Sequence, residues 1–243
     1  MNQSTKIIIG AAAVVIVGGG IYAATTGQKK SDAETHKGAK LGLVLDTGGV
    51  DDHSFNQSAW EGAKAYAKAN NMKSGQNAPV TYFTTADHSD LDQNFNLATK
   101  NKKYNIVYGI GYSLNQAITK SAQLNPKQNF VLVDDIVTNR PNVASVMFRS
   151  EQSSYLAGVA AATKAKENGE KTLGFIGGIH GNIIDAFDAG FEAGVKATDP
   201  TLKVEKQYAN SFTDSAKGKT IAATMYASGI KTIFAAAGFV GNG

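Results

Sequence analysis

The sequence of 243 residues contains no cysteine, and this absence excludes several kinds of site at once. There can be no disulfide framework, no thiolate nucleophile and no cysteine-based zinc site. Arginine is almost as scarce, because only Arg140 and Arg149 are arginines among the 24 basic residues. The lysines are spread thinly and form no basic cluster with interleaved aromatic residues, so we expect no nucleic-acid partner. The dispersed lysines that give the net charge of +4 are then expected to keep the protein soluble or, outside a cell, to suit an anionic cell envelope.

Several enzyme motifs are also missing. The sequence has no His-x-x-x-His, DxDxDG, Gly-x-x-x-x-Gly-Lys-Ser/Thr or Gly-x-Ser-x-Gly pattern. Asp46, Asp51, Asp52 and His53 lie close together and leave a metal-dependent hydrolase as the enzymatic alternative. Adjacent positions in a turn and a helix start point in different directions, however, which argues against a shared metal ion. We therefore expect no catalytic residues, no metal and no cofactor.

The other histidines are His36, His88 and His180, and each stands alone in a polar or loop context. Isolated histidines of this kind are far more often solvated side chains than ligands or bases. We interpret all three as surface residues.

The amino-terminal segment is the longest apolar run in the chain. Residues 7–24 include 18 positions without a charge, which would span roughly 27 Å as a helix at about 1.5 Å per residue. Residues 1–27 are therefore predicted to be a membrane anchor or signal segment, with an uncleaved anchor favoured and cleavage near Ala23 or Ala24 as the alternative. Lysines on both sides leave its orientation undecided. Residues 28–40 are polar and are expected to form a linker.

Beyond the linker, strand and helix patterns alternate. Strands are predicted at 41–45, 80–84, 105–108, 130–133 and 144–148, and helices at 54–70, 91–102 and 113–123. The second half has predicted helices at 151–167, 183–197 and 215–228, and strands at 173–176, 204–208 and 232–235. This alternation is typical of parallel sheets covered by helices, and hence of an α/β fold.

The two halves also match in order and in detail. The Leu-Gly pair at 41 and 42 recurs at 173 and 174, and Trp60-Glu61-Gly62-Ala63-Lys64 has a relative in Phe191-Glu192-Ala193-Gly194-Val195-Lys196. We therefore predict a first lobe at 41–148 and a second lobe at 149–243. The sequence stops in a glycine-rich stretch just after the third strand of the second copy, so we expect a fragment whose second lobe is incomplete.

The first predicted strand leads into a candidate binding rim. Asp46 stands at its carboxyl end, where open α/β sheets bind ligands, and Gly48 and Gly49 allow a tight turn there. Asp51, Asp52 or Ser54 is expected to cap the following helix. The neighbouring Phe55-Asn56 pair offers a flat aromatic face together with a hydrogen-bond donor and acceptor.

Four stretches of sequence carry a resemblance to a known family. They are DTGGVDDHSFNQSAWEG at 46–62, YLAG at 155–158, IGG at 176–178 and GFEAG at 190–194. These stretches resemble the basic membrane protein family, the purine nucleoside receptor lipoproteins of ABC importers, over about residues 40–243. The resemblance implies an α/β, type I periplasmic-binding-protein fold: two Rossmann-like lobes with parallel sheets, which close on a nucleoside without altering it.

The resemblance also implies a set of site residues. In the first lobe, Asp46 would bond polar groups of the ligand and Phe55 would stack on its base, with Asn56 and Asp134 as partners. The second lobe of the family supplies another aromatic residue. Phe187 is the first choice and Phe239, beside Gly238, is the rival, while packing in the core is the competing interpretation of Phe187. Closure would occur about crossovers such as the one near 141–149.

The implied function is an extracytoplasmic substrate-binding protein of an ABC importer, with a permease and an ATPase as partners and with the cell membrane as its location. A ligand-sensing receptor of the same fold, for a sugar or another small molecule, is the alternative, because both would use the same closing cleft. The family carries a lipidated cysteine that this chain lacks, so the anchor at 1–27 would take over the tethering. The family residues that complete the sugar site lie beyond residue 243.

Overall fold

The computed structural model describes residues 38–100 and 103–243. The predicted anchor at 1–27 and most of the predicted linker lie outside this range. Among the described residues, no helix is both long enough and apolar enough to cross a membrane.

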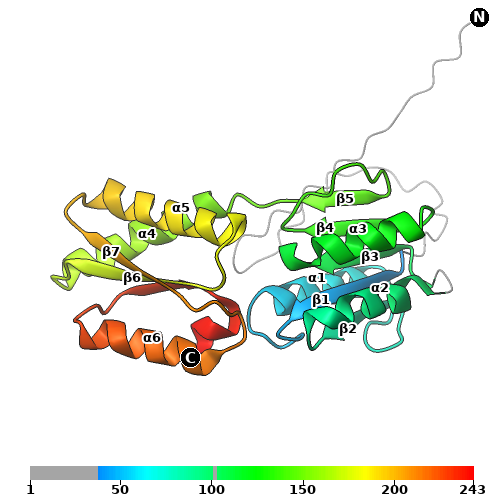
Figure 1. The fold of residues 1–243 in the computed structure, drawn as a ribbon, viewed down its shortest axis with the longest axis horizontal. Helices are drawn as coiled ribbons and strands as arrows, with labels where there is room; N and C mark the ends of the chain where they lie inside the picture. The colour runs from blue at the N-terminus through cyan, green and yellow to red at the C-terminus, as the bar shows by residue number, and fades with distance from the viewer. Residues whose placement is uncertain (1–37, 101–102) are drawn as a thin grey trace, which may run out of the picture. The chain divides into compact units, whose positions relative to one another are not determined.

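The first sheet has five parallel strands in the order β2-β1-β3-β4-β5 (Figure 1, blue to green). The strands are β1 (Leu41–Thr47), β2 (Val80–Thr85), β3 (Ile106–Ile110), β4 (Asn129–Val133) and β5 (Val143–Val146). All five have ends within one or two residues of the predicted ones. β5 begins and ends earlier than predicted, so Met147 and Phe148 belong to the connection that follows it.

Alternating side chains of β1 build a separate core on each face of this sheet. Val44 packs with Phe95 of α2 (Leu91–Thr99) and Ile118 of α3 (Asn115–Leu124). Leu43 and Leu45 point the other way and pack with Trp60 of α1 (Phe55–Ala69). Because both faces of the strand are buried, it reads as a continuous apolar run rather than as an alternating one.

The second sheet has three parallel strands in the order β7-β6-β8. They are β6 (Thr172–Gly177), β7 (Lys203–Tyr208) and β8 (Ile233–Ala236) (Figure 1, yellow to red). Phe175 of β6 packs with α4 (Ser150–Glu167) and α5 (Asn182–Thr198) on one face. Ile176 packs with Met225 of α6 (Ser215–Ala227) on the other.

The two sheets repeat one topology, as the internal sequence match predicted. In each, the first strand of its copy lies in the middle, between the second and the third, giving β2-β1-β3 and β7-β6-β8. Each central strand carries a Leu-Gly pair near its start, at 41 and 42 and at 173 and 174. The α/β fold with two Rossmann-like lobes is therefore confirmed.

Glycines allow α4 and α5 to pack with their backbones in direct contact. A Cβ atom at Gly158 of α4 would overlap the carbonyl oxygen of Phe191, and one at Gly194 of α5 would overlap that of Tyr155. Gly190 is enclosed in the same way by Glu151. No side chain fits between the two helices at these points, so their spacing depends on glycine.

We expect Gly194→Ala to destabilise the protein by about 1–3 kcal/mol, because the added methyl group must push two helix backbones apart. Gly62→Ala is the matched control. It lies in the middle of α1 with nothing within 4 Å of the added Cβ, so we expect it to stabilise by about 0.5–1 kcal/mol through helix propensity. Urea unfolding followed by circular dichroism measures both changes. Equal effects of the two substitutions would contradict the close-packed helix pair.

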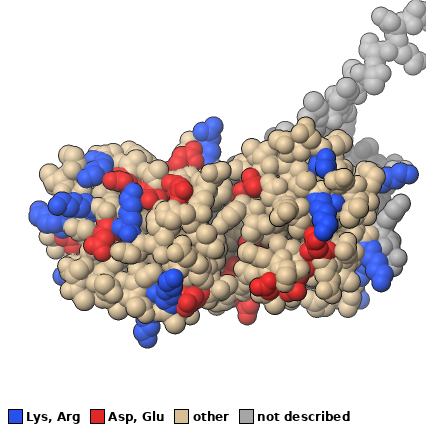
Figure 2. All heavy atoms as spheres, in the orientation of Figure 1, with Lys and Arg blue, Asp and Glu red and all other residues tan. Residues whose placement is uncertain are grey.

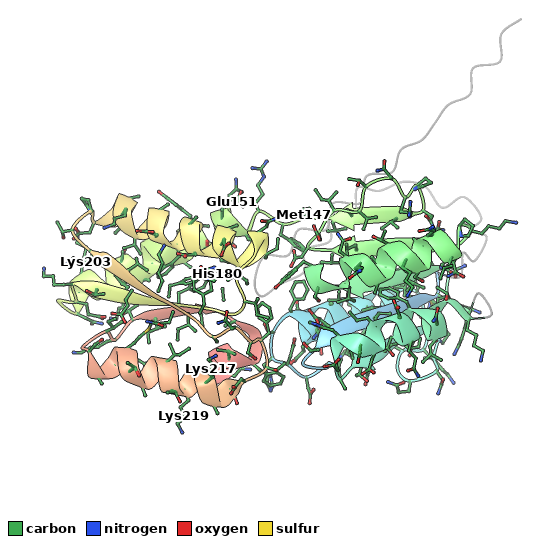
Figure 3. All side chains as sticks on the ribbon, in the orientation of Figure 1. Met147, Glu151, His180, Lys203, Lys217 and Lys219 are labelled. Atoms are coloured by element: carbon green, nitrogen blue, oxygen red, sulfur yellow. The ribbon has the colours of Figure 1, made fainter. Side chains whose placement is uncertain are left out.

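The first lobe connects to the second through a short segment after β5. α4 begins at Ser150, so residues 147–149 form the connection, and Met147 and Glu151 mark its two sides in Figure 3. The side chains of Met147 and Phe148 are exposed in this connection. On the face drawn in Figure 2, basic and acidic side chains are interspersed.

Candidate functional site

A cavity of about 480 Å³ is lined by residues from both lobes. It lies where the carboxyl ends of β1, β4 and β8 lead into loops, which is the edge at which open α/β sheets bind ligands. All seven residues expected from the sequence line it, namely Asp46, Phe55, Asn56, Asp134, Phe187, Gly238 and Phe239.

Asp46 is held by hydrogen bonds from three sides. Its Oδ1 accepts a bond from the backbone N–H of Thr47 at 2.7 Å and lies 2.8 Å from Nε2 of His88. Its Oδ2 accepts a bond from the hydroxyl of Ser113 at 2.5 Å. Asp46 belongs to β1, which runs two residues further than predicted and changes its pairing register with β2 between Val44 and Thr47.

Asn56 lines the cavity, but its amide is already engaged with the backbone. Its Oδ1 accepts from the N–H of Asp46 at 3.2 Å, and its Nδ2 donates to the carbonyl oxygens of Asp46 and Thr47, both at 3.3 Å. The side chain is almost fully buried. Asn56 thus fixes the end of β1 and has little hydrogen-bonding capacity left for a ligand.

Asp52 is the carboxylate that caps α1. Its two oxygens accept bonds from the backbone N–H groups of Ser54, Asn56 and Gln57 at 2.9–3.0 Å. Ser54 occupies the cap position but its side chain makes no capping bond, and Asp51 is exposed. One of the three expected candidates therefore satisfies the free N–H groups of the helix start.

Asp134 is a buried acid with an unused oxygen. It follows β4 directly, has a left-handed backbone with φ of 70° and donates its N–H to the carbonyl of Val146 at 2.8 Å. Its residue is 9% exposed, and Oδ1 has no hydrogen-bond partner among the described residues. Burial raises the pKa of this carboxyl group to about 6.

Aromatic side chains form much of the remaining wall. Phe55 is 37% exposed although it begins a helix, and the ring of Phe239 packs beside Gly48. Phe187 is half-buried and lies 6.5 Å, centroid to centroid, from Phe234 of β8. It packs on the core of the second lobe and lines the cavity as well.

Besides the ring of Phe239 beside Gly48, further contacts link the lobes around the cavity. The rings of Tyr112 and Phe212 meet edge to face at 6.4 Å, and Nδ2 of Asn242 donates to the carbonyl of Asp52 at 3.3 Å. Burial, followed by the charge of Asp46, raises the pKa of Tyr112, so its hydroxyl stays protonated at neutral pH. Asn242 ends the short 3-10 helix Gly238–Asn242.

Sequence reasoning missed His88, Ser113, Tyr112, Phe212 and Phe234. His88 is exposed, as expected, but the interpretation that it stands isolated was wrong because it contacts Asp46. His88 and Ser113 could have been found from the strand order. β2 and β3 flank β1, so the residues that follow β2 and β3 lie around Asp46 near the end of β1.

The cavity can bind a flat, polar ligand that is not an anion. Among the described residues that line it there are three aspartates, six Phe or Tyr residues and no Lys or Arg. Carboxylates accept hydrogen bonds and aromatic faces stack on planar rings, whereas an anion would meet three carboxylates and no lysine or arginine. Within residues 38–100 and 103–243, no group of three or more His, Cys, Asp or Glu side chains is placed to hold a metal ion.

Comparison with known proteins gives the family. The model of the Bmp family, described as ABC transporter substrate-binding protein PnrA-like, matches residues 39–243. The "CD4+ T-cell-stimulating antigen" of Listeria innocua is 44% identical over 221 residues, which cover 91% of this chain and 60% of that protein. The "ABC transporter nucleoside-binding protein BmpA" of Lactococcus lactis subsp. cremoris is 45% identical with the same coverage.

Solved structures agree with the fold. A solute-binding protein of an ABC transporter system from Aeropyrum pernix K1 superposes with a TM-score of 0.73 at 24% identity, over 82% of this chain and 55% of that one. The chain spans about 60% of the length of the curated relatives it matches. The family match over nearly all described residues and the identity to these relatives agree with the motifs in the sequence, and the chain belongs to the Bmp family of PnrA-like ABC transporter substrate-binding proteins.

Proposed function

We propose that this chain binds a nucleoside, with a purine base, non-covalently in the cavity between its lobes. The proposal depends on one observation: the same cavity is lined by an exposed aromatic ring, that of Phe55, and by a buried carboxylate with an unused oxygen, that of Asp134. The base stacks on Phe55, and its N–H groups donate to Asp134. Phe187 or Phe239 contributes the facing aromatic surface, with the backbone of Gly238 beside it.

Two of the three cavity acids, Asp46 and Asp134, set which groups the ligand must present, because Asp52 is occupied in capping α1. Ionised carboxylates only accept hydrogen bonds, so Asp46 and Asp134 each select an N–H or O–H group. A ligand that leaves the buried acceptor of Asp134 unpaired loses about 1–3 kcal/mol, a factor of roughly 5 to 150 in affinity. Asn56 contributes mainly by fixing the backbone that carries Asp46.

The name of the Lactococcus lactis relative supports the same ligand class, because that protein is called a nucleoside-binding protein. By the same reasoning we propose that the chain serves an ABC importer together with a permease and an ATPase. We further propose that it acts outside the cytoplasm, at the cell membrane, with residues 1–27 as its anchor, and that residues 41–148 and 149–243 are its two domains. The ligand leaves unchanged, and no enzymatic step is involved.

Isothermal titration calorimetry of the protein as its own gene encodes it tests the proposal. Inosine, guanosine, adenosine, cytidine, uridine, ribose and a divalent cation are titrated separately. We expect saturable binding of at least one purine nucleoside, recovered unmodified afterwards by chromatography. Binding of ribose alone would favour the sugar receptor of the same fold. A response to the cation with cleavage of the nucleoside would favour a hydrolase instead.

A further inference from the structure

The carboxylate of Asp46 is held in a single orientation by Thr47 and by side chains that follow the two neighbouring strands. Thr47, from β1 itself, donates to Oδ1, His88 follows β2, and Ser113 follows β3. Because β2 and β3 are the two neighbours of β1, His88 and Ser113 approach the carboxylate from opposite sides. The side chain of Asp46 is only 18% exposed, whereas that of His88 is 53% exposed, so His88 reaches the carboxylate from the solvent side.

The wall behind Asp46 is shaped to admit the carboxylate. Gly111 has φ of 116°, a conformation that favours glycine, and a Cβ atom there would lie 3.1 Å from Oδ2. A larger residue would crowd the oxygen that Ser113 bonds. The carboxylate thus sits between a glycine and two polar side chains, with little room for another rotamer.

The proton positions at this cluster follow from the chemistry of the acceptor. An ionised carboxylate only accepts, so Nε2 of His88 must carry the hydrogen in its contact with Oδ1. Oδ1 then receives two donors, and Oδ2 receives one from Ser113. Each oxygen has about two acceptor positions, so one position on Oδ2 remains for a ligand.

We propose that His88 and Ser113 are positioning residues that fix the Asp46 carboxylate so that one acceptor position of Oδ2 faces the ligand. The proposal rests on the nucleoside-binding function proposed above. Neither residue touches the ligand through this role. Both act by reducing the freedom that Asp46 would otherwise lose on binding, which is the effect of preorganisation.

Calorimetry with inosine and guanosine on single variants tests this arrangement. His88→Ala and Ser113→Ala are expected to weaken binding about 3- to 10-fold, the worth of one hydrogen bond. The conservative variants His88→Gln and Ser113→Thr keep a donor and are expected to restore most of the affinity. Melting temperatures should change little in all four, because His88 is exposed and Ser113 is only partly buried.

His180→Gln is the matched control. His180 (Figure 3) is likewise an exposed histidine bonded to an aspartate, with Nδ1 2.9 Å from Oδ1 of Asp185, but its partner Asp185, unlike Asp46, does not line the cavity. We expect its affinity to match wild type. If His88→Ala and Ser113→Ala bind the nucleosides as tightly as wild type and His180→Gln do, the proposal is overturned.

A second measurement separates this proposal from the proposed function. Nitrogen NMR of the His88 imidazole, without any nucleoside, should find hydrogen on Nε2 in wild type and a tautomer mixture in Asp46→Ala, which lacks the acceptor. If wild type has a fixed His88 tautomer but binds no nucleoside, the proposed nucleoside function is wrong, whereas the proposal that His88 helps to fix the Asp46 carboxylate stands. A tautomer mixture in wild type would overturn the positioning even if nucleosides bind.

Discussion

Replacing Phe55 by alanine is expected to weaken purine nucleoside binding by about 10- to 100-fold while leaving the fold unchanged. The ring is 37% exposed and lines the cavity, so in the unliganded protein it contributes little to the core. Stacking of a base on an aromatic side chain is worth about 1–3 kcal/mol by alanine substitution in other base-binding proteins. Calorimetry gives the dissociation constant, and circular dichroism checks the fold.

Tyr226→Ala serves as the control for this substitution. Tyr226 is 56% exposed on α6 and does not line the cavity. Its replacement removes an exposed aromatic ring outside the proposed site and away from the connection between the lobes. Unchanged affinity in Phe55→Ala would remove Phe55 from the ligand site, whereas equal losses in both variants would indicate a general effect on the protein.

Replacing Asp134 by asparagine is expected to stabilise the unliganded protein at neutral pH by about 1–3 kcal/mol. The acid is buried, Oδ1 has no partner among the described residues, and burial raises its pKa to about 6 from the usual 3.8. Each unit of such a shift corresponds to about 1.4 kcal/mol. Asparagine carries no charge to desolvate and also tolerates the left-handed backbone at this position.

The pH dependence of this effect has a definite sign. Because the folded protein holds the Asp134 proton more tightly than the unfolded chain, wild type loses stability as pH rises from about 4 to about 6. The advantage of Asp134→Asn should therefore be absent below about pH 4, grow through this window and level off above it. Urea unfolding at several pH values, followed by the fluorescence of Trp60, the single tryptophan, measures it.

The same substitution should reduce nucleoside affinity, because it replaces an ionised acceptor by a neutral amide and so weakens the bonds to the base N–H groups. A gain in stability together with a loss of binding would identify Asp134 as a residue kept for its ligand. Lower stability in Asp134→Asn across the whole pH range would contradict the unpaired buried carboxylate.

Much of the fold was predictable because the strands of this chain are buried on both faces. Continuous apolar runs such as 41–45 and 173–176 identify central strands, and the repeated Leu-Gly pair identifies the two copies. The ends of strands were predicted less well. β1 continues through Asp46 and Thr47 because the amide of Asn56, ten residues away, bonds the backbone there, and no local pattern reports that.

The site residues likewise fall into those that the sequence predicted and those that it did not. Asp46, Phe55 and Asn56 lie in one motif and are visible together, whereas His88 and Ser113 lie 42 and 67 residues from Asp46 in sequence. Only the order of strands brings them together. Asp52 and Asp51 could not be told apart as helix caps, since the choice depends on the backbone of a turn that includes Gly48 and Gly49, both with positive φ.

The glycine contact between α4 and α5 has a mechanical consequence. α4 follows the connection at residues 147–149 directly, and α5 carries Phe187 into the cavity. Because the backbones of α4 and α5 are in direct contact at Gly158 and Gly194, the two helices cannot slide past each other and form one rigid unit. A rotation of the second lobe about this connection would therefore move Phe187 together with both helices. Looser packing at these glycines would let α5 shift relative to α4, and the position of Phe187 would then depend less on that of α4.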